Sequence, residues 1–133
     1  MIKKNTQLFI LKYIHQENAG SQVARNKGTA ASSGEYIQYL DSDDLLYPDK
    51  IKKQVYFLQE NKECDGVWGG WAKGSLDKHE IIISLAREDL LTQLLTEHCI
   101  VNFSFLMRRN LIAKIGTWDV SIKRNQEMDF QVR

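Results

Sequence analysis

The sequence predicts an α/β domain in which a mostly parallel sheet is flanked by helices. A strand-like run from Leu8 to Ile14, a helical stretch from Ser21 to about Ser32 and a second strand from Tyr36 to Leu40 follow one another. This strand–helix–strand order is typical of a right-handed parallel crossover. The second strand ends at the carboxylates of Asp41 to Asp44, and open α/β sheets bind ligands at the carboxyl ends of their strands.

Length and composition indicate one domain with a core. The chain has 133 residues, of which 43% are hydrophobic, and 18 basic residues balance 17 acidic ones. The net charge of +1 gives no field that would favour nucleic acid or an acidic membrane. Cys64 and Cys99 lie far apart, so we expect reduced thiols. Lys12 interrupts the apolar run near the N-terminus and no stretch has transmembrane length, so we expect a soluble, cytoplasmic protein without a signal peptide.

The first helix is expected to follow a turn at Gln16 to Gly20, with Ser21 as its cap. Gly28 inside this helix costs about 1 kcal/mol relative to alanine, and a close approach of the helix to the sheet would explain it. After the acidic loop, Pro48 suits the first turn of an amphipathic helix that reaches about Asn61.

The second half of the chain continues the alternation of strands and helices. We predict strands at Val67-Trp68, Ile81 to Ile83 and Ile100 to Met107, an exposed charged loop from Lys73 to Glu80, a helix from about Arg87 to Glu97, and a short helix capped by Asn110 and ended by Gly116.

The acidic loop offers hard oxygen ligands from Asp41, Asp43 and Asp44, which suit Mg²⁺ or Mn²⁺. A turn leading into the next helix is the alternative, because Asp and Ser favour turns and caps. A calcium-binding loop is excluded, since Leu46 and Lys52 occupy the positions where Gly and Glu are needed. The sequence also holds no phosphate-binding P-loop and no G-x-S-x-G nucleophile motif.

A longer string surrounds the acidic loop on both sides. Its pattern is N-x-G-x-x-x-A-R-N-x-G, then G-E-Y-I, then L-D-x-D-D, then P-D, and it runs without a gap from Asn18 to about Lys50. The string resembles the nucleotide-sugar-dependent glycosyltransferases of family 2, and a weaker match continues to the end of the chain.

The resemblance implies a GT-A (Rossmann-like) fold. It also implies metal-assisted, inverting transfer of a sugar from a UDP-linked donor to an acceptor hydroxyl, in polysaccharide or glycoconjugate synthesis. The implied cofactor is Mn²⁺ or Mg²⁺, and the implied acceptor is a sugar or lipid-linked group, which allows peripheral contact with a membrane.

The resemblance also implies roles for residues around the donor. Asp43, the last position of the D-x-D, would bind the metal directly. Asp41 would contact the ribose or help to hold the metal through water, and Asp44 would support either role or favour the start of the next helix. Arg25 would lie near the nucleotide, where it would pair with the diphosphate or pin Asp41 in place.

The C-terminal stretch resembles the family's acidic motif. Counting back from Arg133 places Glu127 at the base position, where a carboxylate would take the proton of the acceptor hydroxyl. The family usually has Asp there and an aromatic residue where this chain has Met128, so Asp129 is the rival base and a surface helix start is the alternative. Trp118 resembles an acceptor-side aromatic residue, with a place in the core as its alternative.

Two strands that usually open the family's domain, ending in Pro-x-Tyr-Asn and Asp-Asp-Gly-Ser, have no counterpart in this sequence. We therefore expect residues 1–133 to form a single partial GT-A domain that lacks the first strands and is also shortened at its C-terminus. A non-catalytic fragment with weak or no nucleotide binding is the alternative function. The open edge of the Tyr36 to Leu40 strand would favour self-association.

Overall fold

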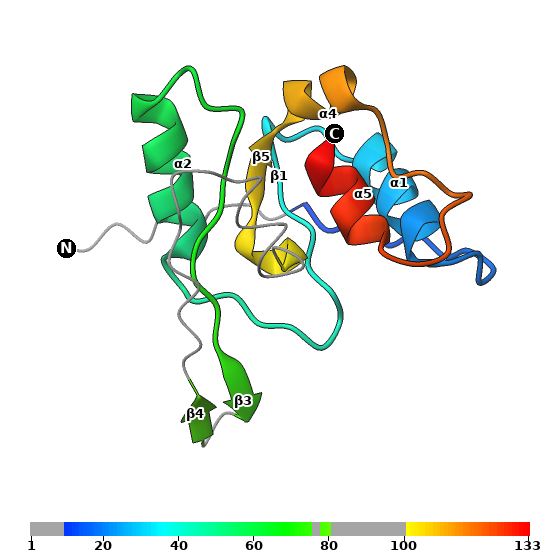
Figure 1. Cartoon of the computed structure of the whole chain (residues 1–133), viewed down its shortest axis with the longest axis horizontal. Helices are drawn as coiled ribbons and strands as arrows, with labels where there is room; N and C mark the ends of the chain where they lie inside the picture. Colours follow the sequence, from blue (N-terminus) through cyan, green and yellow to red (C-terminus); the bar gives the residue numbers. More distant parts are fainter. Residues whose placement is uncertain (1–9, 76–77, 81–100) are drawn as a thin grey trace.

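The structure combines helices with short strands, as the sequence predicts for an α/β protein (Figure 1). The computed structural model describes residues 10–75, 78–80 and 101–133. The elements are α1 (Ser21–Ala31), β1 (Tyr36–Ile37), α2 (Lys50–Glu60), β2 (Gly66–Val67), β3 (Lys73–Ser75), β4 (Lys78–Glu80), the 3-10 helix η1 (Asn102–Ser104), β5 (Leu106–Arg108), α4 (Arg109–Ile115) and α5 (Gln126–Val132).

The main sheet has the strand order β1-β5-β2, and β5 is antiparallel to both of its neighbours. Ile37 pairs with Met107 on one side of β5, and Gly66 pairs with Met107 on the other. β1 and β2 therefore run in the same direction without touching. The prediction of a mostly parallel sheet is not met among the described residues, because a strand from late in the chain lies between the two.

The strand predicted from Leu8 to Ile14 is also wrong over its described part. Residues 10–20 lie in no helix or strand, and the side chains of Ile10, Leu11 and Tyr13 are exposed. Strand-forming residues adopt that structure only where a neighbour pairs with them and covers one face. Here the segment is instead attached through Lys12, whose Nζ donates to the carbonyl oxygen of Ala31 at 2.7 Å.

The helix predicted from Ser21 is confirmed as α1, but its cap is not the serine. Gly20, with φ of 91°, precedes the helix, and its N–H donates to Oδ1 of Asn18 at 3.2 Å. The positive φ is easily reached only by glycine. Ser21 instead donates through Oγ to Oε1 of Gln126 at 3.3 Å, which links α1 to α5.

The helix predicted after the acidic loop is confirmed as α2, with Pro48 in the turn before it. Leu58 is fully buried. Gln54 is also buried and donates through Nε2 to the carbonyl oxygens of Ser104 at 2.8 Å and Val67 at 3.4 Å. One side chain thus holds α2 against both β2 and η1.

Several predictions for the second half need correction. Lys73 to Glu80 contains the antiparallel pair β3–β4 rather than a loop, since backbone pairing does not require apolar side chains. η1 occupies the start of the predicted strand up to Met107, so β5 begins only at Leu106. α4 begins at Arg109 directly after β5, without an Asn110 cap, and ends at Gly116, with φ of 85°, as predicted. Strand 81–83 and helix 87–97 lie outside the described residues.

The core lies where β1, β5, α4 and α5 meet, and its buried residues are Ile37, Met107, Ile112, Trp118 and Phe130. Trp118 is 2% exposed, so it is a core residue. In Figure 1, α1 and α5 lie together on one side of the sheet and α2 lies on the other. None of the helices in these ranges combines the length and apolar character needed to cross a membrane.

Replacing Trp118 with alanine is expected to lower the free energy of unfolding by about 3–5 kcal/mol, the usual effect of removing a buried aromatic ring. The ring is stacked on Phe130 at 4.2 Å between centroids, so its loss leaves a cavity in the core. Urea unfolding measures the change. Tyr56→Ala is the control, because Tyr56 is 65% exposed and a surface change there should stay within about 0.5 kcal/mol. Equal losses in both variants would contradict the place of Trp118 in the core.

Candidate functional site

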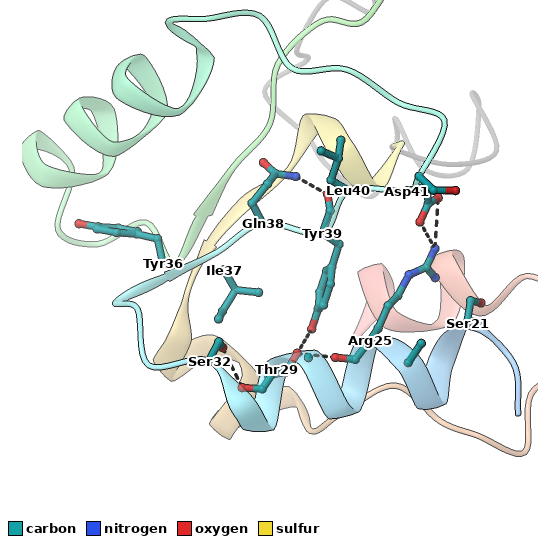
Figure 2. Close-up of a pocket in the computed structure, with 13 residues that line it drawn as sticks. Ser21, Arg25, Thr29, Ser32, Tyr36, Ile37, Gln38, Tyr39, Leu40 and Asp41 are labelled. Atoms are coloured by element: carbon teal, nitrogen blue, oxygen red, sulfur yellow. Dashed lines mark hydrogen bonds and ion pairs between the residues drawn. The ribbon is translucent and has the colours of Figure 1, made fainter. Parts of the chain in front are cut away.

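A pocket of about 520 Å³ lies between α1 and the chain from Tyr36 to Ser42 (Figure 2). Its size is within the range of small-molecule sites. A Cβ added at Gly28 would meet nothing within 4 Å, so the predicted close approach of helix to sheet is wrong and this glycine widens the pocket instead. The side of the pocket formed by α1 consists of Ser21, Ala24, Arg25, Gly28, Thr29 and Ser32.

Arg25 connects the acidic loop to the C-terminal helix. Its Nη2 donates to the two carboxylate oxygens of Asp41 at 3.0 and 3.4 Å. Its Nη1 donates to Oε1 of Glu127 at 3.0 Å. Of the two contacts that the sequence left open for Arg25, the structure therefore contains the one with Asp41, and it adds a contact with Glu127.

A stack of aromatic rings supports this arginine. The guanidinium carbon lies 4.5 Å from the centroid of the Trp118 ring, within the range of a cation–π contact. Trp118 is parallel to Phe130, and the ring of Tyr39 meets both rings edge-on at 5.3 and 6.1 Å. The hydroxyl of Tyr39 lies 2.8 Å from Oγ1 of Thr29 on α1. Arg25 is thus held against a fixed surface, and its side chain is only 10% exposed.

Two further residues of α1 hold the C-terminal segment in place. Asn26 donates through Nδ2 to the carbonyl oxygen of Trp118 at 2.8 Å and accepts from the N–H of Trp118 at 2.9 Å. Gln22 donates through Nε2 to the carbonyl oxygen of Ile122 at 2.6 Å. Asn26 is part of the A-R-N string but was given no role, and Gln22 was not singled out. Their spacing of four on the helix face that carries Arg25 does not identify a partner.

The acidic loop forms a turn in which the N–H of Asp44 donates to the carbonyl oxygen of Asp41 at 3.2 Å. Asp41 is paired with Arg25, whereas within the described ranges Asp43 and Asp44 have no cationic partner. Desolvation, followed by the charges of Asp43 and Asp41, raises the pKa of Asp44. The three carboxylates are therefore close enough to repel one another, and a cation would relieve that repulsion.

The ligand chemistry of this loop fits a divalent cation that is shared with a substrate. Over the described part of the chain, no group of three or more His, Cys, Asp or Glu side chains is arranged to hold a metal ion by itself. Mg²⁺ commonly binds only one or two carboxylates and takes its other ligands from phosphates and water. Asp43 and Asp44 offer oxygens of that kind.

The two candidate bases have different surroundings. Glu127 and Asp129 both lie in the first turn of α5, so the acidic motif is also the helix start that the sequence offered as the alternative. Glu127 faces Arg25 and is 31% exposed. Asp129 pairs with Arg133 at 2.9 Å, and Arg133 also donates to the carbonyl oxygens of Ile115 and Thr117. The structure therefore brings Glu127, and not Asp129, to the acidic loop.

Lys50, which the sequence analysis gave no role, lies half-buried at the start of α2. Its Nζ donates to Oε1 of Gln38, and Gln38 donates through Nε2 to the carbonyl oxygens of Tyr39 and Asn102. Burial of the ammonium lowers the pKa of Lys50 from its ordinary value of 10.5 to about 8.

The shift predicts a pH dependence of stability. Because the unfolded chain binds this proton more tightly than the folded chain does, the free energy of unfolding should rise as the pH rises from about 8 towards 10.5. Lys50→Met keeps the apolar stem and removes the ammonium. Urea unfolding of both chains between these pH values should show the wild type gaining stability relative to Lys50→Met. A constant or shrinking difference would contradict the burial of this charge.

Comparison with known proteins identifies the class. The family model described as "Glycosyl transferase family 2" matches residues 2–116, so the chain belongs to glycosyltransferase family 2.

Individual relatives agree with this family. The chain is 24% identical to an uncharacterized glycosyltransferase of Methanocaldococcus jannaschii, over 98% of this chain and 46% of the relative. It is 30% identical to an uncharacterized glycosyltransferase of Rickettsia typhi, over 88% of this chain and 39% of the relative. A Bacillus subtilis protein, provisionally named a teichuronic acid biosynthesis glycosyltransferase, is 47% identical over 43% of this chain and 22% of the relative. The chain thus spans less than half the length of these relatives.

Proposed function

We propose that this chain carries the cation-binding loop and the base of an inverting glycosyltransferase with the GT-A fold. The observation that carries the proposal is the pair of contacts made by Arg25, because it brings the acidic loop and the C-terminal acidic motif into one site. These two regions were singled out separately in the sequence, and a sugar-transfer site needs a donor side and an acceptor side next to each other.

On the donor side, Asp43 would bind Mn²⁺ or Mg²⁺ directly, with Asp44 beside it. The cation would supply positive charge that neutralises the leaving nucleoside diphosphate of a UDP-sugar. Asp41 is held by Arg25, so its role would be a contact with the ribose or with water on the metal.

On the acceptor side, Glu127 would take the proton of the acceptor hydroxyl while that oxygen attacks the anomeric carbon. The bond to the diphosphate breaks as the new glycosidic bond forms, so attack from the opposite face inverts the anomeric configuration. Glu127 is suited to this role because it is partly exposed and its carboxylate is directed by one hydrogen bond from Arg25.

The substrates follow from the family. The donor would be a UDP-sugar and the acceptor a sugar or lipid-linked group, used in polysaccharide or glycoconjugate synthesis, which is in line with the printed name of the Bacillus subtilis relative. We place the chain in the cytoplasm, with peripheral contact to a membrane where the acceptor is lipid-linked.

A second candidate function is binding without transfer. In the described part of the main sheet, β1 pairs with β5 on one side and with no described strand on the other, so that edge is open there. A partial domain of this kind would bind nucleotide weakly or not at all, and it would associate through the open edge. A sedimentation coefficient that stays monomeric over a wide range of concentrations would contradict this self-association.

Isothermal titration of the chain with UDP, in Mn²⁺ and in EDTA, tests the proposed function. We expect binding that depends on the cation. Absence of binding in Mn²⁺ would contradict the proposal and favour the second candidate.

A further inference from the structure

We propose that Arg25 is a positioning residue that holds the base, Glu127, at a fixed place beside the acidic loop, and that it does not bind the donor diphosphate. This inference rests on the proposed function, because it concerns the same site. Its subject is the arginine that, among the described residues, contacts both the acidic loop and the start of α5.

The hydrogen-bonding capacity of Arg25 is already directed at protein groups. A guanidinium presents its donors in a rigid planar fork. One terminal nitrogen donates to Asp41 and the other donates to Glu127. A diphosphate would have to compete with these two carboxylates for the same guanidinium.

The surroundings of Arg25 also restrict access. The Trp118 ring covers the guanidinium at 4.5 Å, and the arginine side chain is 10% exposed, whereas the side chain of Asp41 is 51% exposed. The buried member of the set is therefore the arginine, and the carboxylates are the parts that solvent and substrate reach. This is the arrangement expected of a support rather than of a substrate ligand.

The charges of Arg25, Asp41 and Glu127 explain why the arginine is needed to hold the two carboxylates. Arg25 contributes one positive charge and the two carboxylates contribute two negative charges. Without the arginine, Glu127 and Asp41 would repel each other and would lose their shared donor. Glu127 and Asp41 would then both lose the group that holds them, while Asp43 and Asp44, which do not contact Arg25, would keep their places. The base would therefore be affected more than the direct cation ligands.

The test uses Arg25→Gln, Arg25→Lys and the control Gln22→Ala. The control removes another bond between α1 and the C-terminal segment, the one to Ile122, and leaves both ion pairs of Arg25 intact. Each chain is titrated with UDP in Mn²⁺ by calorimetry. Turnover is followed as UDP release from UDP-glucose, UDP-galactose and UDP-N-acetylglucosamine.

We expect Arg25→Gln to lower kcat by about 10²-fold, the effect of a misplacement of roughly 1 Å. The Kd for UDP should change by less than about tenfold, because only Asp41 on the donor side loses a partner. Arg25→Lys keeps the charge but not the fork, so it should recover part of the loss. Gln22→Ala should lose stability without this loss of kcat. A loss of UDP affinity of about tenfold or more in Arg25→Gln, or an equal loss of kcat in Gln22→Ala, would overturn the inference.

A second measurement keeps the failure of the inference apart from the failure of the proposed function. Urea unfolding of Arg25→Gln, Glu127→Gln and the double variant gives the coupling between the two side chains without any substrate. Non-additive shifts support the pair, and additive shifts overturn it. If the wild type neither binds UDP nor releases it, the proposed function fails, and this coupling alone decides whether Arg25 holds Glu127.

Discussion

Asp43→Asn is expected to abolish the part of UDP binding that depends on Mn²⁺. Asp43 has no cationic partner in the described ranges, so its charge is available to a metal ion. Asparagine keeps the size and one oxygen of the side chain but removes the anion that a divalent cation prefers. Titration of both chains with UDP, in Mn²⁺ and in EDTA, measures the change.

The matched control for this variant is Asp49→Asn. Asp49 directly precedes α2 and is paired with Lys53 at 2.6 Å. Its substitution removes one negative charge, as Asp43→Asn does, but from a residue outside the acidic loop. We expect it to retain the dependence on Mn²⁺. If Asp43→Asn binds UDP as tightly as the wild type and gains as much from Mn²⁺, the assignment of the metal ligand is wrong.

Glu127→Gln is expected to lower turnover by about 10²–10⁴-fold, the usual contribution of a general base, with little change in UDP affinity. Glutamine can still accept the hydrogen bond from Arg25 through Oε1, so the place of the side chain is kept while its basicity is lost. UDP release and calorimetry together separate the two effects.

Asp129→Asn distinguishes the rival base. Asp129 is paired with Arg133, which in turn donates to the carbonyl oxygens of Ile115 at the end of α4 and Thr117 just after it. Loss of the Asp129 carboxylate should therefore lower stability more than turnover. A larger loss of turnover in Asp129→Asn than in Glu127→Gln would mean that the base has been placed two residues too early.

Local patterns predicted the elements that depend on local chemistry. The helices α1 and α2 lie close to their predicted bounds, and Gly116 ends α4 because the backbone needs a positive φ there. Strands depend on partners, and those predictions were less successful. Residues 10–14 pair with no strand among the described residues, and β3 and β4 pair within a stretch that was too polar to indicate strands.

In the candidate site, too, the sequence indicated individual residues but not the contacts that depend on tertiary packing. The resemblance singled out Arg25, Asp41 and Glu127 one by one, but nothing in their spacing indicated that a single guanidinium contacts both carboxylates. The roles of Asn26 and Gln22 were not predicted, because their partners are backbone groups far along the chain. Such contacts depend on tertiary packing, so a single sequence does not reveal them. That residues 1–133 form one partial domain stays a prediction.

The central claim is that the acidic loop and the start of α5 form one site around a bound cation. Paramagnetic broadening of amide signals tests it most directly, with ¹⁵N-labelled chain, UDP and Mn²⁺, and with Mg²⁺ as the diamagnetic reference. We predict broadening at Asp43, Asp44 and Glu127, and none at the C-terminal end of α2, which lies on the other side of the sheet from α5 in Figure 1. Broadening confined to the acidic loop, or absent from both regions, would contradict the account.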